Sequence, residues 1–179
     1  MRSVEGVLPD FLTPILPKID GESIREGPID IHRLISGNAA SVATNLGGGR
    51  NGHLTLTMRA GYYMEQTGFA FVPPHNPCDY PQRMRSAQEQ ALGTEIFRSN
   101  QALFQKYTAV DGTLKKHIVT AVEPVFLSPL MDHLTGFGQV YALTTMQHLF
   151  FSYRAIDKID LKEKIVKTMG PYDPTEPLS

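Results

Sequence analysis

The sequence predicts an all-α protein of about six or seven helices, preceded by an extended Pro-rich N-terminal arm. Three observations predict this class. Apolar residues recur at helical spacing in several windows, helix-starting and helix-breaking residues flank those windows, and the one alternating segment has no partner strand. The length of 179 residues corresponds to one main domain. We therefore expect an arm over residues 1–22, a helical domain over residues 23–170 and a linker or tail over residues 171–179.

The arm contains several prolines, whose spacing disfavours a long helix. Its apolar residues are expected to lie against the domain: Leu8, Phe11, Leu12, Ile15 and Leu16. The first helix is predicted over residues 23–44, and the glycine run that begins at Gly47 ends it. Its apolar positions at helical spacing are Ile31, Leu34, Ile35, Ala39 and Val42.

The next segment contains short elements and a loop. Residues 53–58 alternate as a strand would, but no partner strand is present, so we expect a short helix there and keep the strand as the alternative. Another short helix is expected from residue 57 or 58 to residue 66, ended by Gly68. Four prolines then predict a loop over residues 69–82.

The clearest helix start is the capping box formed by Ser86 and Glu89. A long helix is predicted from there to Tyr107, with a buried stripe of Leu92, Ile96, Leu103, Phe104 and Tyr107. A separate helix is predicted over residues 111–122, before Pro124.

Three further segments complete the predicted helices. A short helix is expected over residues 125–134, and a glycine turn follows it. A strongly amphipathic helix is predicted next, with Val140, Leu143, Met146, Leu149, Phe150 and Tyr153 on its apolar face. The last helix is predicted over residues 160–169 and ends at Gly170.

Composition excludes several classes of protein. The net charge of −1, with 17 basic and 18 acidic residues, argues against a dominant nucleic-acid surface and against binding to anionic membranes. A single cysteine, Cys78, excludes an internal disulfide framework. The sequence contains neither a transmembrane run of about 18 apolar residues nor a signal-peptide pattern. We therefore expect a cytoplasmic protein with no membrane partner.

The residue patterns predict no enzyme, no cofactor, no metal site and no small-molecule substrate. The glycine-rich residues 47–52 lack the Gly-Lys-Ser/Thr ending of a phosphate-binding loop and are interpreted as a turn. No two histidines have the four-residue spacing of a zinc-binding helix. Of the residues that could act as a nucleophile and its base, Cys78 and His75 are the best available pair. A small enzyme that uses this pair is therefore a third hypothesis, after assembly and nucleic-acid binding.

Two sets of residues are candidates for binding surfaces. Basic side chains that would contact RNA are Arg83, Arg85, Lys115 and Lys116. Aromatic side chains that exceed what the simplest core stripes require are candidates for an oligomer interface, where aromatic residues are enriched; they are Phe126, Phe137, Tyr141 and Phe151.

A series of short phrases runs in order along nearly the whole chain: His32-Arg33-Leu34-Ile35, Asn38 to Val42, Asn45 to Gly49 with Gly52-His53-Leu54, Phe71 to Pro77, Ala109-Val110-Asp111 with Leu114-Lys115-Lys116, Leu134 to Phe137, His148-Leu149-Phe150 with Tyr153, and Met169 to Pro174. In order and spacing, this series resembles the N-terminal part of the Gag (capsid-like) region of copia-type (Pseudoviridae-like) LTR retrotransposon polyproteins. No single phrase is specific.

The resemblance implies a capsid-like helical bundle that forms homo-oligomers around element RNA and has no catalytic residues. The family pattern continues past Ser179, and the Cys-x-x-Cys-type zinc knuckle is missing here, which leaves open a truncated or degenerate copy or a short gene product. We therefore expect a structural Gag-like protein. The alternative is a small nucleic-acid-binding protein without shell assembly.

Overall fold

The computed structural model describes residues 8–19, 26–77 and 86–153. Within these ranges five helices follow one another: α1 (Glu26–Ser41), α2 (Ala60–Thr67), α3 (Ala87–Ala121), α4 (Pro124–Leu127) and a helix over residues 142–153. Short 3-10 turns lie between them, and these ranges contain no strand, only an isolated bridge between Asp132 and Gly136. The all-α prediction is confirmed, with slightly fewer helices than expected.

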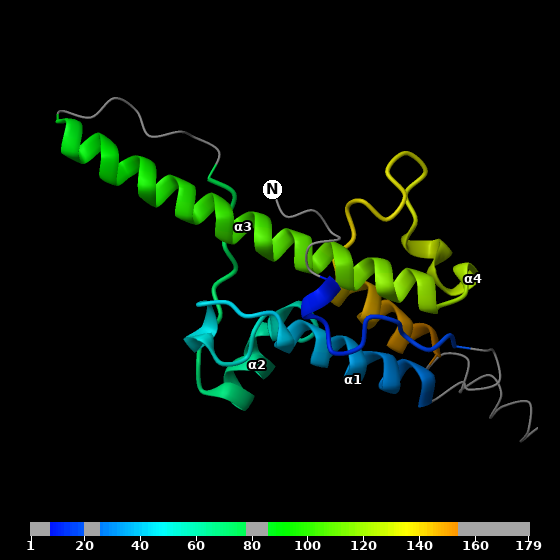
Figure 1. The fold of residues 1–179 in the computed structure, drawn as a ribbon. Coiled ribbons are helices and arrows are strands. Elements are labelled where there is room, and N and C mark those ends of the chain that lie inside the picture. Colours follow the sequence, from blue (N-terminus) through cyan, green and yellow to red (C-terminus); the bar gives the residue numbers. More distant parts are fainter. Residues whose placement is uncertain (1–7, 20–25, 78–85, 154–179) are drawn as a thin grey trace, which may run out of the picture.

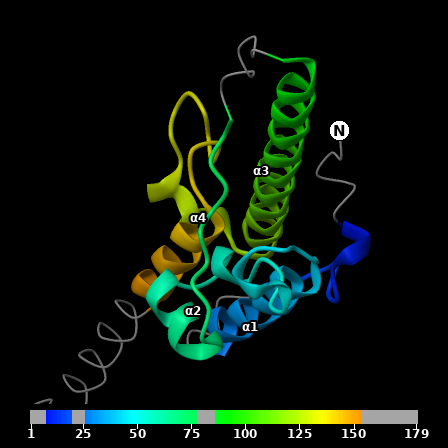
Figure 2. The ribbon, with the colours of Figure 1, turned by 90° about the vertical axis from the view of Figure 1, so that its left-hand side faces the viewer.

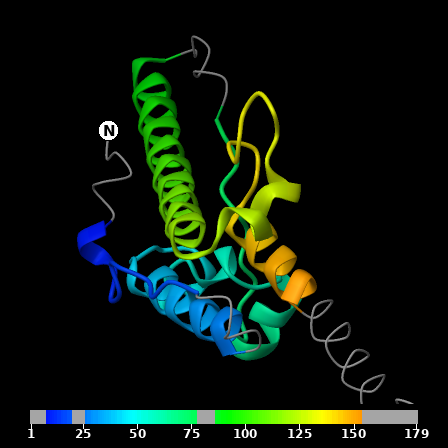
Figure 3. The same cartoon turned by 90° about the vertical axis from the view of Figure 1, so that its right-hand side faces the viewer.

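The longest element, α3, determines the shape of the described chain. Figure 1 shows α1 and helix 142–153 (orange) beneath the C-terminal half of α3, whereas its N-terminal half extends beyond them. The two side views agree, with α3 rising away from the other helices (Figures 2 and 3). A helix of 35 residues is ~52 Å long, so helices of ordinary length cannot cover all of it.

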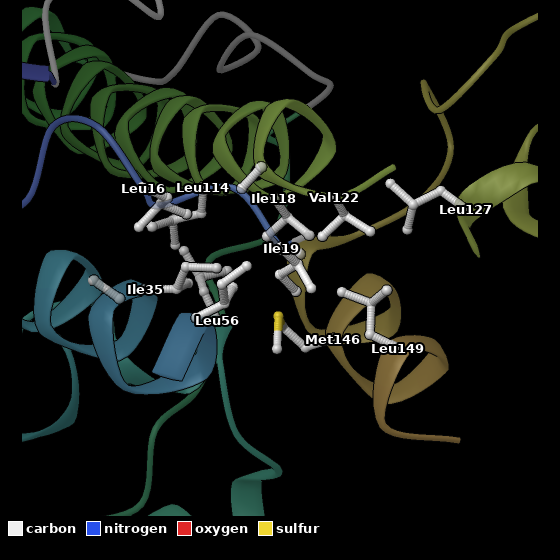
Figure 4. Close-up of a cluster of buried hydrophobic side chains, with 14 of the residues drawn as sticks. Leu16, Ile19, Ile35, Leu56, Leu114, Ile118, Val122, Leu127, Met146 and Leu149 are labelled. Carbon is white, nitrogen blue, oxygen red and sulfur yellow. The ribbon is translucent and has the colours of Figure 1, made fainter. Parts of the chain in front are cut away.

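The core forms where α1, the C-terminal half of α3 and helix 142–153 meet the arm. Figure 4 shows Ile35, Leu114, Ile118, Met146 and Leu149 converging from these three helices. The arm adds the buried side chains of Phe11, Leu16 and Ile19, whereas its Leu12 and Ile15 remain exposed. Removal of this apolar surface from water is the main force that holds the elements together.

The arm is also fixed by hydrogen bonds from α1. The fully buried Asn38 accepts from the Thr13 backbone N–H and donates to the Thr13 carbonyl, both at 2.7 Å. Because both polar ends of the buried amide are paired, this contact fixes the position of the arm without leaving an unsatisfied group. Ile19 donates its backbone N–H to the carbonyl of Ala121 at 2.9 Å, which ties the end of the arm to the end of α3.

The glycine-rich segment forms a tight turn after α1, as the sequence predicted. Gly47, Gly48, Gly49 and Gly52 all have positive φ, a conformation that side chains other than glycine rarely adopt. A Cβ at Gly52 would collide with the carbonyls of Ala39 and Ala40. The carbonyl of the buried Gly47 accepts a hydrogen bond from the Tyr63 hydroxyl at 3.0 Å, so this segment is packed as structure.

Residues 53–58 are neither a strand nor an α-helix but contain a 3-10 turn, Leu54–Leu56. The preceding His53 is buried and satisfies the end of α1, since its backbone N–H donates to Ala39 at 2.8 Å and its ring Nδ1 lies 3.0 Å from the Val42 carbonyl. Burial lowers the pKa of His53. The short helix predicted next is confirmed as α2, which ends at Gly68 with φ of 74°.

The prediction of two helices between Ser86 and Val122 is wrong. The predicted capping box is present, with Ser86 Oγ accepting from Glu89 N–H at 3.2 Å and Glu89 Oε2 accepting from Ser86 N–H at 3.1 Å. From there α3 continues without a break to Ala121. Residues 108–110 contain no glycine or proline, and Gly112 alone does not end a helix.

The predicted buried stripe of α3 is also wrong at its N-terminal end. Leu92 and Ile96 are 59% and 51% exposed, while Leu103, Phe104 and Tyr107 are only half-buried. Full burial begins at Val110. The spacing correctly identified one apolar face, but it carried no information about what covers that face.

The helix predicted over residues 125–134 is shorter than expected. After α4 and a 3-10 turn, Ser128–Leu130, the chain forms a loop. There Asp132 Oδ1 accepts from the backbone N–H groups of Leu134 and Thr135 at 2.9 and 2.8 Å, a side-chain interaction that competes with helix formation. The next helix begins at residue 142, two residues later than its apolar stripe indicated.

Several predictions lie outside the described residues. They are the helix over residues 160–169, the tail over residues 171–179, residues 78–82 of the predicted loop, and the RNA candidates Arg83 and Arg85. Residues 69–77 are described and contain no helix, as expected for a loop.

Candidate functional site

The most distinctive surface is the uncovered face of the N-terminal half of α3. Leu92, Ile96 and Leu103 recur at intervals of four and seven residues, which places them on one side of the helix. Further along the same side, Val110 and Leu114 have no exposed surface. One apolar stripe therefore passes from the core out to solvent. An apolar stripe exposed in this way is typical of a surface that contacts another protein.

The four aromatic interface candidates are not brought together into one patch. Tyr141 and Phe151 are largely exposed, but ten residues separate them, which is about 15 Å along a helix. Phe126 is half-buried and stacks on Tyr153, with 5.0 Å between ring centroids. Phe137 is half-buried against the core. Two of the four thus pack within the chain, and two remain free for contacts.

The structure separates the two basic RNA candidates that it describes. Lys115 Nζ donates to the carbonyls of Phe137 and Gly138 at 2.7 and 3.4 Å, so it holds the 131–139 loop against α3. Lys116 is exposed and points elsewhere, since successive residues of a helix differ by about 100° in direction. Arg83 and Arg85 lie outside the described residues, so the structure does not assemble a basic cluster from this set.

A cavity of 180 Å³ lies between the arm and α3. Its lining is mostly apolar and consists of Leu8, Pro14, Ile15, Leu16, Thr113, Lys116, His117, Thr120 and Ala121. The His117 ring packs edge-on against Phe11, with centroids 5.3 Å apart, and its buried Nδ1 has no hydrogen-bond partner among the described residues. Burial, with a smaller effect of Lys116, lowers the pKa of His117. This volume is below the roughly 300 Å³ at which typical ligand pockets begin.

Asp111 is the main acidic group inside the fold. Its Oδ1 accepts from the Ala142 backbone N–H at 3.0 Å, so a residue of α3 caps the start of helix 142–153. Burial raises the pKa of Asp111, while this hydrogen bond and Lys115 act in the opposite direction. Burial also raises the pKa of the neighbouring Tyr107 to about 12. Asp111 and Tyr107 are not among the residues that line the cavity described above. Their pKa shifts therefore reflect packing between elements.

Metal binding and membrane insertion have no candidate among the described residues. There, no group of three His, Cys, Asp or Glu side chains is close enough to hold a metal ion. None of the described helices is long and apolar enough to cross a membrane. His75 is exposed, and its proposed partner Cys78 lies outside the described residues.

Sequence reasoning assigned Leu92 and Ile96 to the core and therefore missed them as surface residues. One signal could have identified them: without a helix breaker before Pro124, the predicted apolar stripe is longer than the neighbouring helices can cover. Comparisons with protein-family models, with curated proteins and with solved structures found no match to the chain.

Proposed function

We propose that this chain is a structural assembly protein that associates with further copies of itself, as the Gag region of a copia-type retrotransposon does when it forms a capsid-like particle around element RNA. The observation that carries self-association is the apolar stripe that leaves the core along α3 and becomes exposed at Leu92 and Ile96. A monomer gains nothing from an exposed apolar stripe, whereas an oligomer gains hydrophobic free energy by burying it.

A second exposed apolar surface supports the same proposal. Leu134, at 83% exposure, projects from the loop that follows α4, and the nearby Met131 is also exposed. Single exposed apolar residues are ordinary on protein surfaces. Two separate apolar surfaces, however, would give each copy contacts with more than one neighbour, as a particle requires.

The RNA component of the proposal rests on the resemblance more than on the described side chains. Lys115 is occupied by carbonyl groups of its own chain, and the net charge is −1. We therefore expect protein–protein contacts to form first and RNA to bind to the assembled form.

The test is light scattering coupled to size-exclusion chromatography across a concentration series, with and without RNA. The expected result is a mass that rises with protein concentration in the absence of RNA. A monomer at every concentration would refute self-association. A monomer that binds RNA, with an affinity that falls steeply with salt, would support the nucleic-acid-binding alternative instead.

A further inference from the structure

We propose that the exposed half of α3 pairs with the same half of a second copy, and that the two helices run antiparallel about a two-fold axis that crosses the stripe at the level of residues 97 and 98 along the helix. This inference rests on the proposed self-association and identifies the surface that forms its first contact. It begins from the apolar stripe of Leu92, Ile96, Ser99 and Leu103, whose intervals of four, three and four residues are those of a coiled-coil seam.

The direction of the pair follows from the position of the remaining helices. Only the C-terminal half of α3 is covered by α1 and helix 142–153 (Figures 1 and 2). If the two α3 helices were parallel and in register, α1 and helix 142–153 of both copies would lie side by side at the same end of the pair and would crowd each other. In the antiparallel arrangement these helices lie at opposite ends of the pair, and the contact is made by the two exposed halves of α3.

The sequence of the exposed half is complementary to itself in this arrangement. With the axis midway between residues 97 and 98, Leu92 of one copy faces Leu103 of the other, and Ile96 faces Ser99. At the two ends of the overlap, Glu89 faces Lys106, so a negative and a positive side chain meet. A two-fold interface makes each of these contacts twice.

Both charged residues can take part without giving up their present roles. Glu89 uses Oε2 in the capping box, which leaves its second carboxylate oxygen for another donor. Lys106 Nζ donates to the Ala43 carbonyl at 2.6 Å, which occupies one of the three donors of the ammonium group. The small Ser99 beside Ile96 leaves room for the larger side chain in that layer.

Cysteine cross-linking tests the register. Leu92→Cys and Leu103→Cys are made in separate chains that also carry Cys78→Ser, and the chains are oxidised alone and as a mixture. The proposed register predicts a disulfide-linked dimer in the mixture and far less in either chain alone, because position 92 lies opposite 103 and not opposite itself. Equal cross-linking in all three samples, or none in the mixture, would overturn it.

The strength of association provides the second test. Replacing Leu92 with Glu puts two charges into the proposed interface and should weaken dimerisation at least about tenfold. Ile29→Glu, at a similarly exposed apolar residue of α1 outside the proposed interface, is the matched control and should leave this dimer intact. If the wild-type chain associates but Leu92→Glu associates equally well, this interface is refuted and self-association stands. If the wild-type chain is monomeric, the proposed function itself fails.

Discussion

The two halves of α3 have the same pattern but different environments. Both carry apolar residues along one face, yet Leu114 in the C-terminal half is fully buried and Leu92 in the N-terminal half is mostly exposed. The C-terminal half also holds the buried Asp111 and the half-buried His117, which contact other elements. The N-terminal half begins at the capping box, and its stripe residues Leu92 and Ile96 remain more than half exposed.

This difference shows that an apolar helix face and the burial of that face are separate properties, which the spacing of apolar residues does not distinguish. Helical spacing indicates that one face of a helix is apolar, but the cover of that face is supplied by segments distant in sequence. In the covered half, burial is already complete within one chain. In the exposed half, the same kind of residue is available for a partner. The comparison therefore predicts that equivalent substitutions will have unequal effects on the isolated chain.

The largest expected difference is between Leu114→Ala and Leu92→Ala. Truncation of the fully buried Leu114 leaves a cavity and should lower the free energy of unfolding by about 2–5 kcal/mol. Truncation of Leu92 should change it by less than about 0.5 kcal/mol in dilute solution, where no partner covers the residue. Urea denaturation monitored by circular dichroism at low protein concentration measures both. Equal losses would show that Leu92 is buried within the chain after all.

A smaller and local effect is expected for Ser86→Ala at the start of α3. Loss of the capping box should weaken the first turn by about 1 kcal/mol. Because α1 and helix 142–153 do not cover this half, the loss should appear as faster hydrogen exchange at Gln90, whose N–H donates to the Ser86 carbonyl at 3.0 Å. The midpoint of thermal unfolding should change little. Gln101→Ala, at an exposed position in the same half but away from the cap and from the apolar stripe, is the control and should leave the exchange of Gln90 as it is.

Features that depend on neighbouring residues could be predicted from the sequence. The buried positions Ile31, Ile35 and Ala39 follow from spacing within α1, and the C-terminal end of α2 and the start of α3 follow from Gly68 and Ser86. Each of these assignments uses chemistry within about one turn of the residue concerned.

Features that join distant segments could not be predicted. Asp111 caps a helix 31 residues later, and Asn38 holds the arm 25 residues earlier; no local pattern marks either residue. The same limit applies to the candidate surface. Phe126 was expected at an interface because it exceeded the local stripe, yet the distant Tyr153 supplies its stacking partner.

The smallest predicted effect concerns pH and acts on the covered half of α3. The folded-state pKa of His117 lies below its ordinary value of 6.5, so the unfolded chain binds a proton more readily. The contribution of His117 to stability is therefore present above about pH 6.5 and is lost as the pH falls below it. His53, whose pKa burial also lowers, acts in the same direction.

Asp111 acts in the opposite direction, because its folded pKa is raised and protonation at low pH relieves the cost of its burial. The difference between wild type and His117→Leu isolates the histidine. Since Nδ1 of His117 has no partner among the described residues, the substitution breaks no hydrogen bond of that atom and should reduce the loss of stability between pH 7.5 and 5.5. Urea midpoints at the two pH values measure this, with the exposed His133→Gln as the control. An unchanged pH dependence in His117→Leu would show that His117 does not contribute to the acid sensitivity.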